Sequence, residues 1–167
     1  MALEIKPAPL TREAFQPFGD VITIDGAKVL SINEGTTDRF HDLCTVDVEE
    51  NGGRPLISVF RGRPRPTPIE IKMMERHPIS SQAFVPLDRR PYLIVVADDR
   101  AELTPVALRV FLASGEQGVN YRRGVWHHPL LSLETSSDFL VIDRGGPSDN
   151  LEEHWFDDNV GPIRVVV

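Results

Sequence analysis

The sequence has a single cysteine, no long apolar run and too few basic residues to balance its acidic ones. Cys44 cannot form a disulfide bond within the chain, and a chain without disulfides is typical of a reducing compartment. No apolar run approaches membrane-spanning length, and the N-terminal residues lack the basic and apolar segments of a signal peptide. The net charge of −7 argues against nucleic acid and anionic membranes as partners. We therefore expect a cytoplasmic protein.

Long helical patterns are also missing, and short apolar runs between glycine and proline turns take their place. We expect one domain over residues 1–167, with one or two short helical turns, one of them capped by Thr11 over 12–15. The 14 prolines suit loops and sheet edges. The predicted strands are 3–5, 21–24, 29–33, 40–48, 56–60, 69–77, 82–87, 92–97, 106–113, 130–135, 139–143 and 163–167. This series predicts an all-β sandwich or barrel.

The segment 115–129 combines three glycines with two adjacent histidines. Glycines at this density suit turns or a close backbone approach. On an extended chain, His127 and His128 point to opposite faces. The downstream alternation, in which Leu131 is apolar, indicates that odd positions are buried. It predicts His127 inside the barrel and His128 outside, unless a bulge at Pro129 shifts the register.

A second informative stretch begins at Ile69, where apolar and charged residues alternate. The alternation predicts one half-buried strand and places Glu75 and His77 on its inner face. An acid and an imidazole at this spacing suit metal ligands or proton carriers. Gln82 begins the next strand. Buried polar groups need partners, so Glu75, His77, Gln82 and His127 either satisfy one another or form a metal or proton-transfer pocket.

This spacing resembles the cupin family, a jelly-roll type of β-barrel. Its first motif has two histidines one residue apart and a glutamate five residues later, and its second has a histidine three residues after a glycine. Glu75 and His77 stand at the paired histidines, Gln82 at the glutamate, and His127 follows Gly124. The resemblance implies that these four residues hold a divalent ion, such as nickel or manganese. Because Gln82 offers only a neutral oxygen, we expect an exchangeable ion, or else a site of acids, bases and hydrogen-bond partners only.

Longer segments are similar to the ureidoglycolate lyase family, formerly called ureidoglycolate hydrolase. The similar segments are 32–35, 39–43, 75–78, 82–84, 115–121, 125–129 and 142–146. They run in the same order across almost the whole domain, and the similarity fades after about residue 150. The resemblance implies a generally dimeric, cupin-type barrel that splits ureidoglycolate into glyoxylate and urea during purine breakdown through allantoin.

This reaction needs a base for the substrate hydroxyl and an acid for the ureido nitrogen. The catalytic candidates are His127, His77 and Glu75. An arginine fork suits the substrate carboxylate, and Arg39, Arg61, Arg123 and Arg144 are equal candidates. The candidates for hydrogen bonds to the urea group are Asn33, His41, Gln117, Asn120 and Tyr121. For each of these residues, solvation or a bond to loop backbone is the competing role.

Two classes of function remain open from the residues. One is a carbon–nitrogen lyase of the amidine-lyase type, and the other is a non-catalytic cupin domain that binds a small molecule in a regulatory role. The inward acid–imidazole set favours the enzyme, because binding pockets are mostly apolar. The apolar terminal segments 3–5 and 163–167 would expose edges on a monomer, which predicts a homodimer that buries at least one of them.

Overall fold

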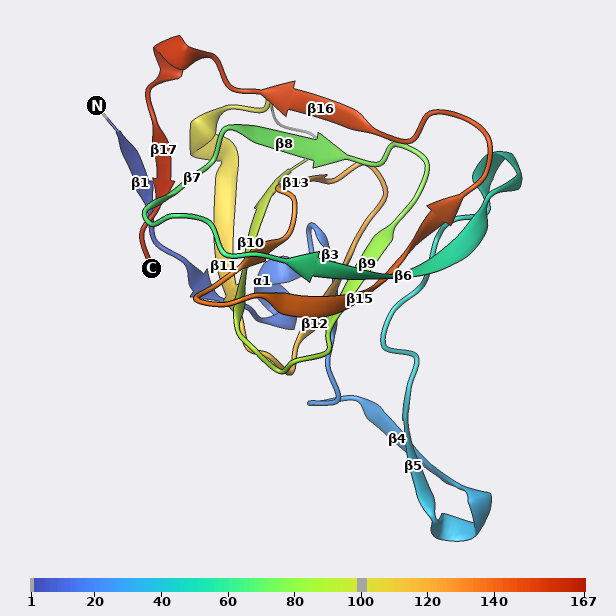
Figure 1. Cartoon of the computed structure of the whole chain (residues 1–167). Helices are drawn as coiled ribbons and strands as arrows, with labels where there is room; N and C mark the ends of the chain where they lie inside the picture. The colour runs from blue at the N-terminus through green and yellow to red at the C-terminus, as the bar shows by residue number, and fades with distance from the viewer. Residues whose placement is uncertain (1, 99–101) are drawn as a thin grey trace.

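Two β-sheets face each other in the computed structural model, which describes residues 2–98 and 102–167 (Figure 1). The five-stranded sheet has the order β3 (Gly19–Ile22), β12 (Gly118–Tyr121), β9 (Gln82–Pro86), β15 (Ser137–Gly145) and β6 (Arg54–Gly62). The larger sheet has the order β16 (Glu152–Trp155), β8 (Met73–Arg76), β13 (Trp126–His127), β10 (Tyr92–Ala97), β11 (Leu108–Ala113) and β2 (Ala8–Pro9), and β14 (Leu131–Ser132) also pairs with β10. The predicted all-β, cupin-like class is confirmed.

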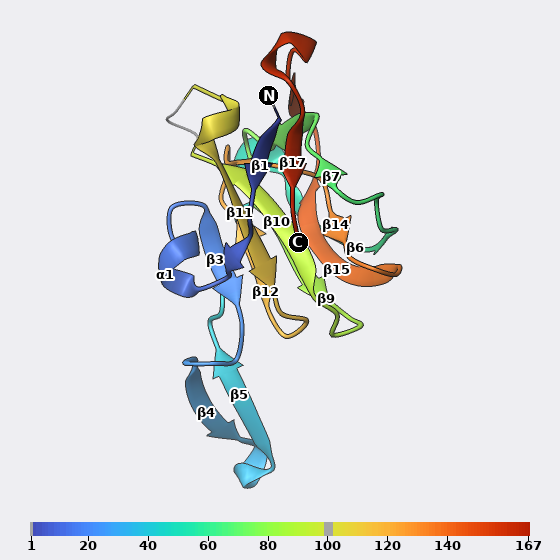
Figure 2. The same cartoon turned by 90° about the vertical axis from the view of Figure 1, so that its left-hand side faces the viewer.

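A third sheet covers the outer face of the larger one. It joins both ends of the chain in the order β1 (Leu3–Ile5), β17 (Ile163–Val165) and β7 (Ile69–Glu70). β1 and β17 are parallel, with Leu3 opposite Ile163, and Figure 2 shows them side by side. Both terminal strands thus lie against the body of their own chain.

A fourth, two-stranded sheet projects from the body (Figures 1 and 2). It consists of β4 (Lys28–Ile32) and β5 (Thr37–His41), joined by the 3₁₀ turn η1 (Asn33–Gly35). We call residues 28–41 the arm. The following segment, residues 42–53, returns to the body and is called the strap.

Helical structure is limited to short turns in the described part of the chain. The helix α1 (Arg12–Phe15) is capped as predicted, because the Thr11 side chain accepts a hydrogen bond from the Ala14 N–H at 3.1 Å. The other 3₁₀ turns are η2 (Glu50–Gly52), η3 (Pro105–Ala107) and η4 (Asp158–Val160). Within residues 2–98 and 102–167, no helix has the length and apolarity needed to cross a membrane.

Two hydrophobic cores lie on either side of β10, which is buried on both faces. Alternate side chains from Tyr92 onward belong to the core between the two large sheets. The other side chains, from Leu93 onward, belong to a second core beneath the terminal strands. The inner core also contains Phe15, Val21, Phe84, Phe111, Val119, Tyr121, Phe139 and Val141.

The predicted strand 40–48 is wrong. β5 ends at His41, and the next residue, Asp42, has a φ of 56°, which interrupts the extended backbone. The strap then follows an irregular path along the body, where the Asp47 N–H donates to the Ser81 hydroxyl at 2.8 Å. Its apolar character reflects the burial of Val48 rather than strand pairing.

The predicted single strand 69–77 is two strands in different sheets. β7 pairs with β17, whereas β8 pairs with β13 and β16. Ile69 and Met74 both pack in the second core, so the alternation breaks between the two strands. Glu75 lies on the opposite face of β8 from Met74, as the prediction requires, although the alternation from Ile69 does not carry it there.

The remaining differences are short elements and shifted ends. β6 continues to Gly62, beyond the predicted strand 56–60, and the predicted strand 130–135 is reduced to β14. β12 was not expected within the glycine-rich segment. A side chain at Gly118 would come within 2.6 Å of the Phe84 carbonyl oxygen, which confirms the predicted close backbone approach.

The terminal strands do not need a second subunit to bury them. Ile163 and Val165 are buried in the second core, and Leu3 and Ile5 pack against it. The expectation that these strands are left uncovered on a monomer is therefore wrong, because they cover each other and β10, and the homodimer stays a prediction.

We predict that Ile163→Ala lowers the free energy of unfolding by about 2–5 kcal/mol, because it leaves a cavity in the second core. Val167→Ala is the matched control, since Val167 is 67% exposed and its loss should cost no more than about 0.5 kcal/mol. Urea unfolding of both variants measures the difference. Equal stabilities would mean that the C-terminal strand does not pack as described.

Candidate active site

Four polar side chains from β8, β9, β13 and the turn after β8 meet inside the barrel. His127 lies directly opposite Glu75 in the antiparallel pair of β13 and β8, and its Nε2 is 3.5 Å from a Glu75 carboxylate oxygen. The Gln82 Oε1 is 3.1 Å from the His77 Nε2 and 3.2 Å from the His127 Nε2. The ligand atoms of Glu75, His77 and His127 all lie within 4.8 Å of one another. The convergence expected from the sequence is thus present.

A β-bulge brings both adjacent histidines into the interior. His127 pairs with Val96, whereas Leu131 pairs with Leu93, so the histidine-bearing chain has one extra residue over this span. Leu131 consequently packs in the second core, on the opposite side from His127. The expectation that His128 points outward is wrong, because its side chain is 3% exposed. His127 is inside as predicted, although the alternation from Leu131 does not explain it.

His128 is held as a neutral imidazole. Burial lowers its pKa to about 4, although a hydrogen bond to the Pro129 carbonyl at 2.7 Å opposes the shift. Its Nε2 has no hydrogen-bond partner among the residues that the structure describes. The ring lines a narrow interior space with Tyr92 and Tyr121, next to the four converging groups.

The hydrogen-bond partners assign the same tautomer to both converging histidines. The His77 Nδ1 is 2.7 Å from the Asn150 carbonyl, and the His127 Nδ1 is 3.0 Å from the Val125 carbonyl. Because a carbonyl only accepts, each Nδ1 carries the hydrogen, and in a neutral ring the Nε2 presents a lone pair. Both lone pairs therefore point at the Gln82 oxygen.

This donor set fits a bound cation. Two imidazole nitrogens, an amide oxygen and a carboxylate oxygen all present lone pairs to one small space, where they repel one another. A proton or a divalent cation between them removes that repulsion, and imidazole and carboxylate groups are ordinary ligands of such ions. The backbone carbonyls behind the rings accept the Nδ1–H and fix the orientation of each ring, as such acceptors do for histidines that bind a metal.

Charge and stacking define the wall of this cluster. Burial raises the pKa of Glu75, but a proton shared between its carboxylate and His127, together with positive charge on the neighbouring imidazoles, outweighs burial, so the net pKa is lowered. Tyr121 stacks on His127, with ring centroids 4.2 Å apart and planes 9° from parallel. Burial, together with the charge of Glu75, raises the pKa of Tyr121, which keeps its hydroxyl protonated. Tyr121 is thus the one urea-binding candidate in contact with the cluster.

A hollow of about 250 Å³ opens beside His77. Its lining residues are His77, Ser80, Asp143, Arg144, Asn150 and Leu151. Among the four candidate arginines, Arg144 is therefore the one that lines the hollow next to the cluster. Two of its N–H groups donate to the Glu50 carbonyl, at 2.7 and 3.2 Å.

Asp143 also lines the hollow, although it was not among the candidate residues predicted from the sequence. One carboxylate oxygen is 3.5 Å from the Gln82 amide nitrogen. The other is buried without a hydrogen-bond partner within the described ranges. The signal that could have found it is the alternation in β15, where Phe139 and Val141 are buried and Asp143 is the next residue on that face.

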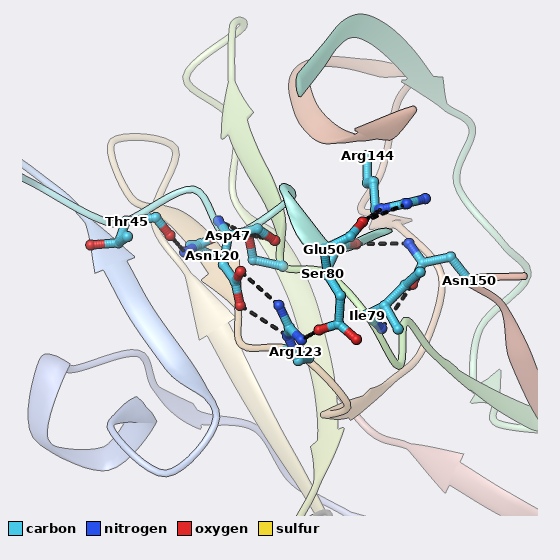
Figure 3. Close-up of polar contacts among 10 residues, drawn as sticks. Thr45, Asp47, Glu50, Ile79, Ser80, Asn120, Arg123, Arg144 and Asn150 are labelled. Atoms are coloured by element: carbon cyan, nitrogen blue, oxygen red, sulfur yellow. Dashed lines mark hydrogen bonds and ion pairs between the residues drawn. The ribbon is translucent and has the colours of Figure 1, made fainter. Parts of the chain in front are cut away.

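The strap is fastened across this side of the barrel by polar contacts (Figure 3). Arg123 donates to the Asp47 carboxylate at 2.8 and 3.0 Å and forms an ion pair with Glu50. The Asn120 amide donates to the Thr45 carbonyl at 2.9 Å. Asn120 therefore has the loop-backbone partner that was its competing role, whereas Arg123 forms ion pairs with the strap instead of being merely solvated.

The structure does not bring the other candidates to the cluster. Arg61 forms an ion pair with Asp138 on the outer face of the five-stranded sheet, at 2.7 Å. The Gln117 side chain binds the backbone of Leu10 and Ser114. Asn33, Arg39 and His41 lie on the projecting arm.

Facing β-sheets with an acid, an amide and two imidazoles converging between them define a cupin-type protein with a potential metal site. A family model described as ureidoglycolate lyase matches residues 2–162. Proteins named ureidoglycolate lyase from Brucella melitensis biotype 2 and Brucella anthropi are each 59% identical, over 90% and 94% of this chain and 88% and 92% of their own lengths. One from Burkholderia mallei is 59% identical over 87% of this chain and 85% of its own. The chain belongs to the ureidoglycolate lyase family.

Proposed function

We propose that this protein is a ureidoglycolate lyase, which cleaves ureidoglycolate to glyoxylate and urea in purine breakdown through allantoin. The observation that carries the proposal is the cluster of Glu75, His77, Gln82 and His127 inside a chain of this family. The alternative, a non-catalytic binding module, is less well supported because the cluster consists of groups that bind ions and move protons.

The reaction balances without water. The hydroxyl proton leaves its oxygen, and that oxygen's electrons form the new carbonyl of glyoxylate. The bond between the central carbon and the ureido nitrogen breaks, and its electron pair takes up a proton to give urea. Hydrolysis of the urea group would instead need an activated water. Over residues 2–98 and 102–167, Glu75, His77 and His127 form the only acid–imidazole cluster of three, so a second cluster for a dinuclear water site is missing there.

Glu75 is the group that we assign to the proton transfer. Its side chain is 19% exposed, whereas His127 is 1% exposed, and its lowered pKa keeps it a carboxylate that can accept the hydroxyl proton. The hydroxyl and the ureido nitrogen are attached to the same carbon, so one carboxylate can take the proton from the first and return it to the second. His127 and His77 hold the opposite side of the pocket.

We further propose that His77, Gln82, His127 and one carboxylate oxygen of Glu75 hold a divalent ion such as nickel or manganese, which leaves the second Glu75 oxygen for the proton transfer. When bound, the ion supplies positive charge near the substrate hydroxyl and makes its proton easier to remove. With a single carboxylate in the set, we expect the ion to exchange readily.

The hollow beside His77 suits the two ends of the substrate. Arg144 supplies N–H donors for the substrate carboxylate, and the unpartnered Asp143 oxygen accepts from the ureido N–H groups. This assignment places the cleaved carbon between the two side chains and beside the cluster. We also propose that the enzyme acts as a homodimer, since the arm is not covered within one chain.

The purified protein should convert ureidoglycolate to equal amounts of glyoxylate and intact urea. His127→Ala should lower turnover by roughly 100-fold or more with the fold retained. The ring is needed whether the cluster binds an ion or works only through acids, bases and hydrogen bonds. His154→Ala is the matched control, as His154 contacts Trp126 and Phe156 on the outside of β8. Ammonia released without added urease would contradict the lyase reaction, and normal turnover of His127→Ala would contradict the site.

Removal of metal should lower turnover, and nickel or manganese should restore it. The same ions should raise the melting temperature of the wild-type protein but not of His77→Ala, because a ligand that binds only the folded state stabilises it. Thermal scans with and without chelator measure this apart from activity. Full turnover in protein that elemental analysis finds free of metal would show that the four residues act without an ion.

The two products can serve as probes of the hollow. Asp143→Asn should weaken inhibition by urea by about 10-fold or more and leave inhibition by glyoxylate unchanged. The Gln82 amide nitrogen donates to the oxygen of the new asparagine, so the asparagine NH₂ faces urea, which then meets a donor instead of an acceptor. Arg144→Lys should weaken inhibition by glyoxylate alone. Asp138→Asn, on the outer face of the same strand, is the control. If either variant weakened inhibition by urea and inhibition by glyoxylate equally, the assignment of Asp143 to urea and Arg144 to the carboxylate would be wrong.

A further inference from the structure

The arm is an isolated hairpin with apolar side chains in solvent. Among the described residues its strands pair only with each other. Val29 and Phe40 are cross-strand partners on one face and are 51% and 36% exposed, and Ile32 near the tip is 38% exposed. A two-stranded hairpin is at best marginally stable in water without a surface to pack on. The arm therefore needs a partner that its own body does not supply.

The same chain has an uncovered apolar sheet face. On β6, Ile57 and Val59 are 73% and 59% exposed. They lie opposite Ile142 and Leu140 of β15, which are half-buried, so the four side chains form one patch on the outer face of the five-stranded sheet. β6 is also the edge strand of that sheet. A patch of this kind beside an open edge indicates a protein–protein contact.

We propose that the arm of one chain docks on the Ile57–Val59 patch of a second copy, and that the two copies exchange arms about a two-fold axis. The arm extends away from its own body in both views, so it is placed to reach a neighbour and not its own sheet (Figures 1 and 2). An exchange covers both arms and both patches at once and closes without leaving a further surface for growth. Apolar burial on both sides supplies the driving force.

Docking would also reach the active site of the chain that supplies the arm. The arm continues at His41 into the strap, whose Glu50 carbonyl accepts hydrogen bonds from Arg144 at the hollow, while Asp47 and the Glu50 carboxylate contact Arg123. A docked arm fixes the start of the strap on the partner, while these contacts fix its end on its own barrel. The inference rests on the proposed homodimer and is independent of the proposed reaction.

Light scattering tests whether the arm and the patch hold the dimer. The wild type should have twice the mass of the 18.7 kDa chain. Phe40→Asp and Val59→Asp should each be monomers at micromolar concentration, with unchanged circular dichroism. Val106→Asp, at a site that is 75% exposed, is the control and should stay dimeric. A monomeric wild type would overturn both the dimer and the contact, whereas a dimeric Phe40→Asp would overturn the contact and leave the homodimer standing.

Cross-linking tests which surfaces meet. In a Cys44→Ser background, Val29→Cys and Val59→Cys are each made singly, then co-expressed and treated with a bis-maleimide. The proposal expects a covalent dimer only when both variants are present, because the arm of one chain meets the sheet of the other. A cross-link in Val29→Cys by itself would indicate arm–arm pairing, and one in Val59→Cys by itself would indicate pairing of two β6 edges. Either result would overturn the exchange.

Discussion

The constraint on which the site depends is the mutual repulsion of lone pairs inside the barrel. The Nε2 atoms of His77 and His127 both face the Gln82 oxygen, because backbone carbonyls take the Nδ1–H on the far side of each ring. This arrangement is unfavourable without a positive charge between the groups. It persists because each ring is fixed from behind, His77 by the loop at Asn150 and His127 by the chain two residues before it. The rigidity of the surrounding sheets thus prepares the site for a cation or a proton.

The fold adds one local irregularity to make this possible. A regular strand would send His127 and His128 to opposite faces, and the extra residue between β13 and β14 turns both inward. The cost is a buried imidazole at His128, which burial keeps neutral. The same register shift places Leu131 of β14 in the second core, where its packing stabilises the sheet that carries the site. Site and core are therefore set by the same bulge.

The fold class and the four converging residues could be predicted from the sequence, whereas the strap and the hollow could not. The all-β class followed from short apolar runs and many turn residues, which depend on local chemistry alone. The convergence of Glu75, His77, Gln82 and His127 was expected from alternation and from cupin-like spacing, and it is present even though the alternation breaks in β7–β8 and at the bulge. The strap and the hollow were not predictable, because they depend on contacts between residues far apart in the chain, such as Arg123 with Asp47. Asp143 could not be singled out from the sequence, because an acid that follows buried apolar positions also marks the end of a strand, as in the predicted strand 139–143.

The charge of the cluster explains how an acidic protein could take an anionic substrate. The chain carries a net charge of −7, which repels a carboxylate at distances that salt does not screen. The usual cupin set has one carboxylate at its glutamate position, and here that position is the neutral Gln82 while Glu75 replaces a histidine. The set still contains one carboxylate, although at a different position. One negative charge and a divalent ion would leave the centre with a net positive charge. Together with Arg144 at the hollow, that charge opposes the negative field of the whole molecule at the place where we propose that the substrate carboxylate binds.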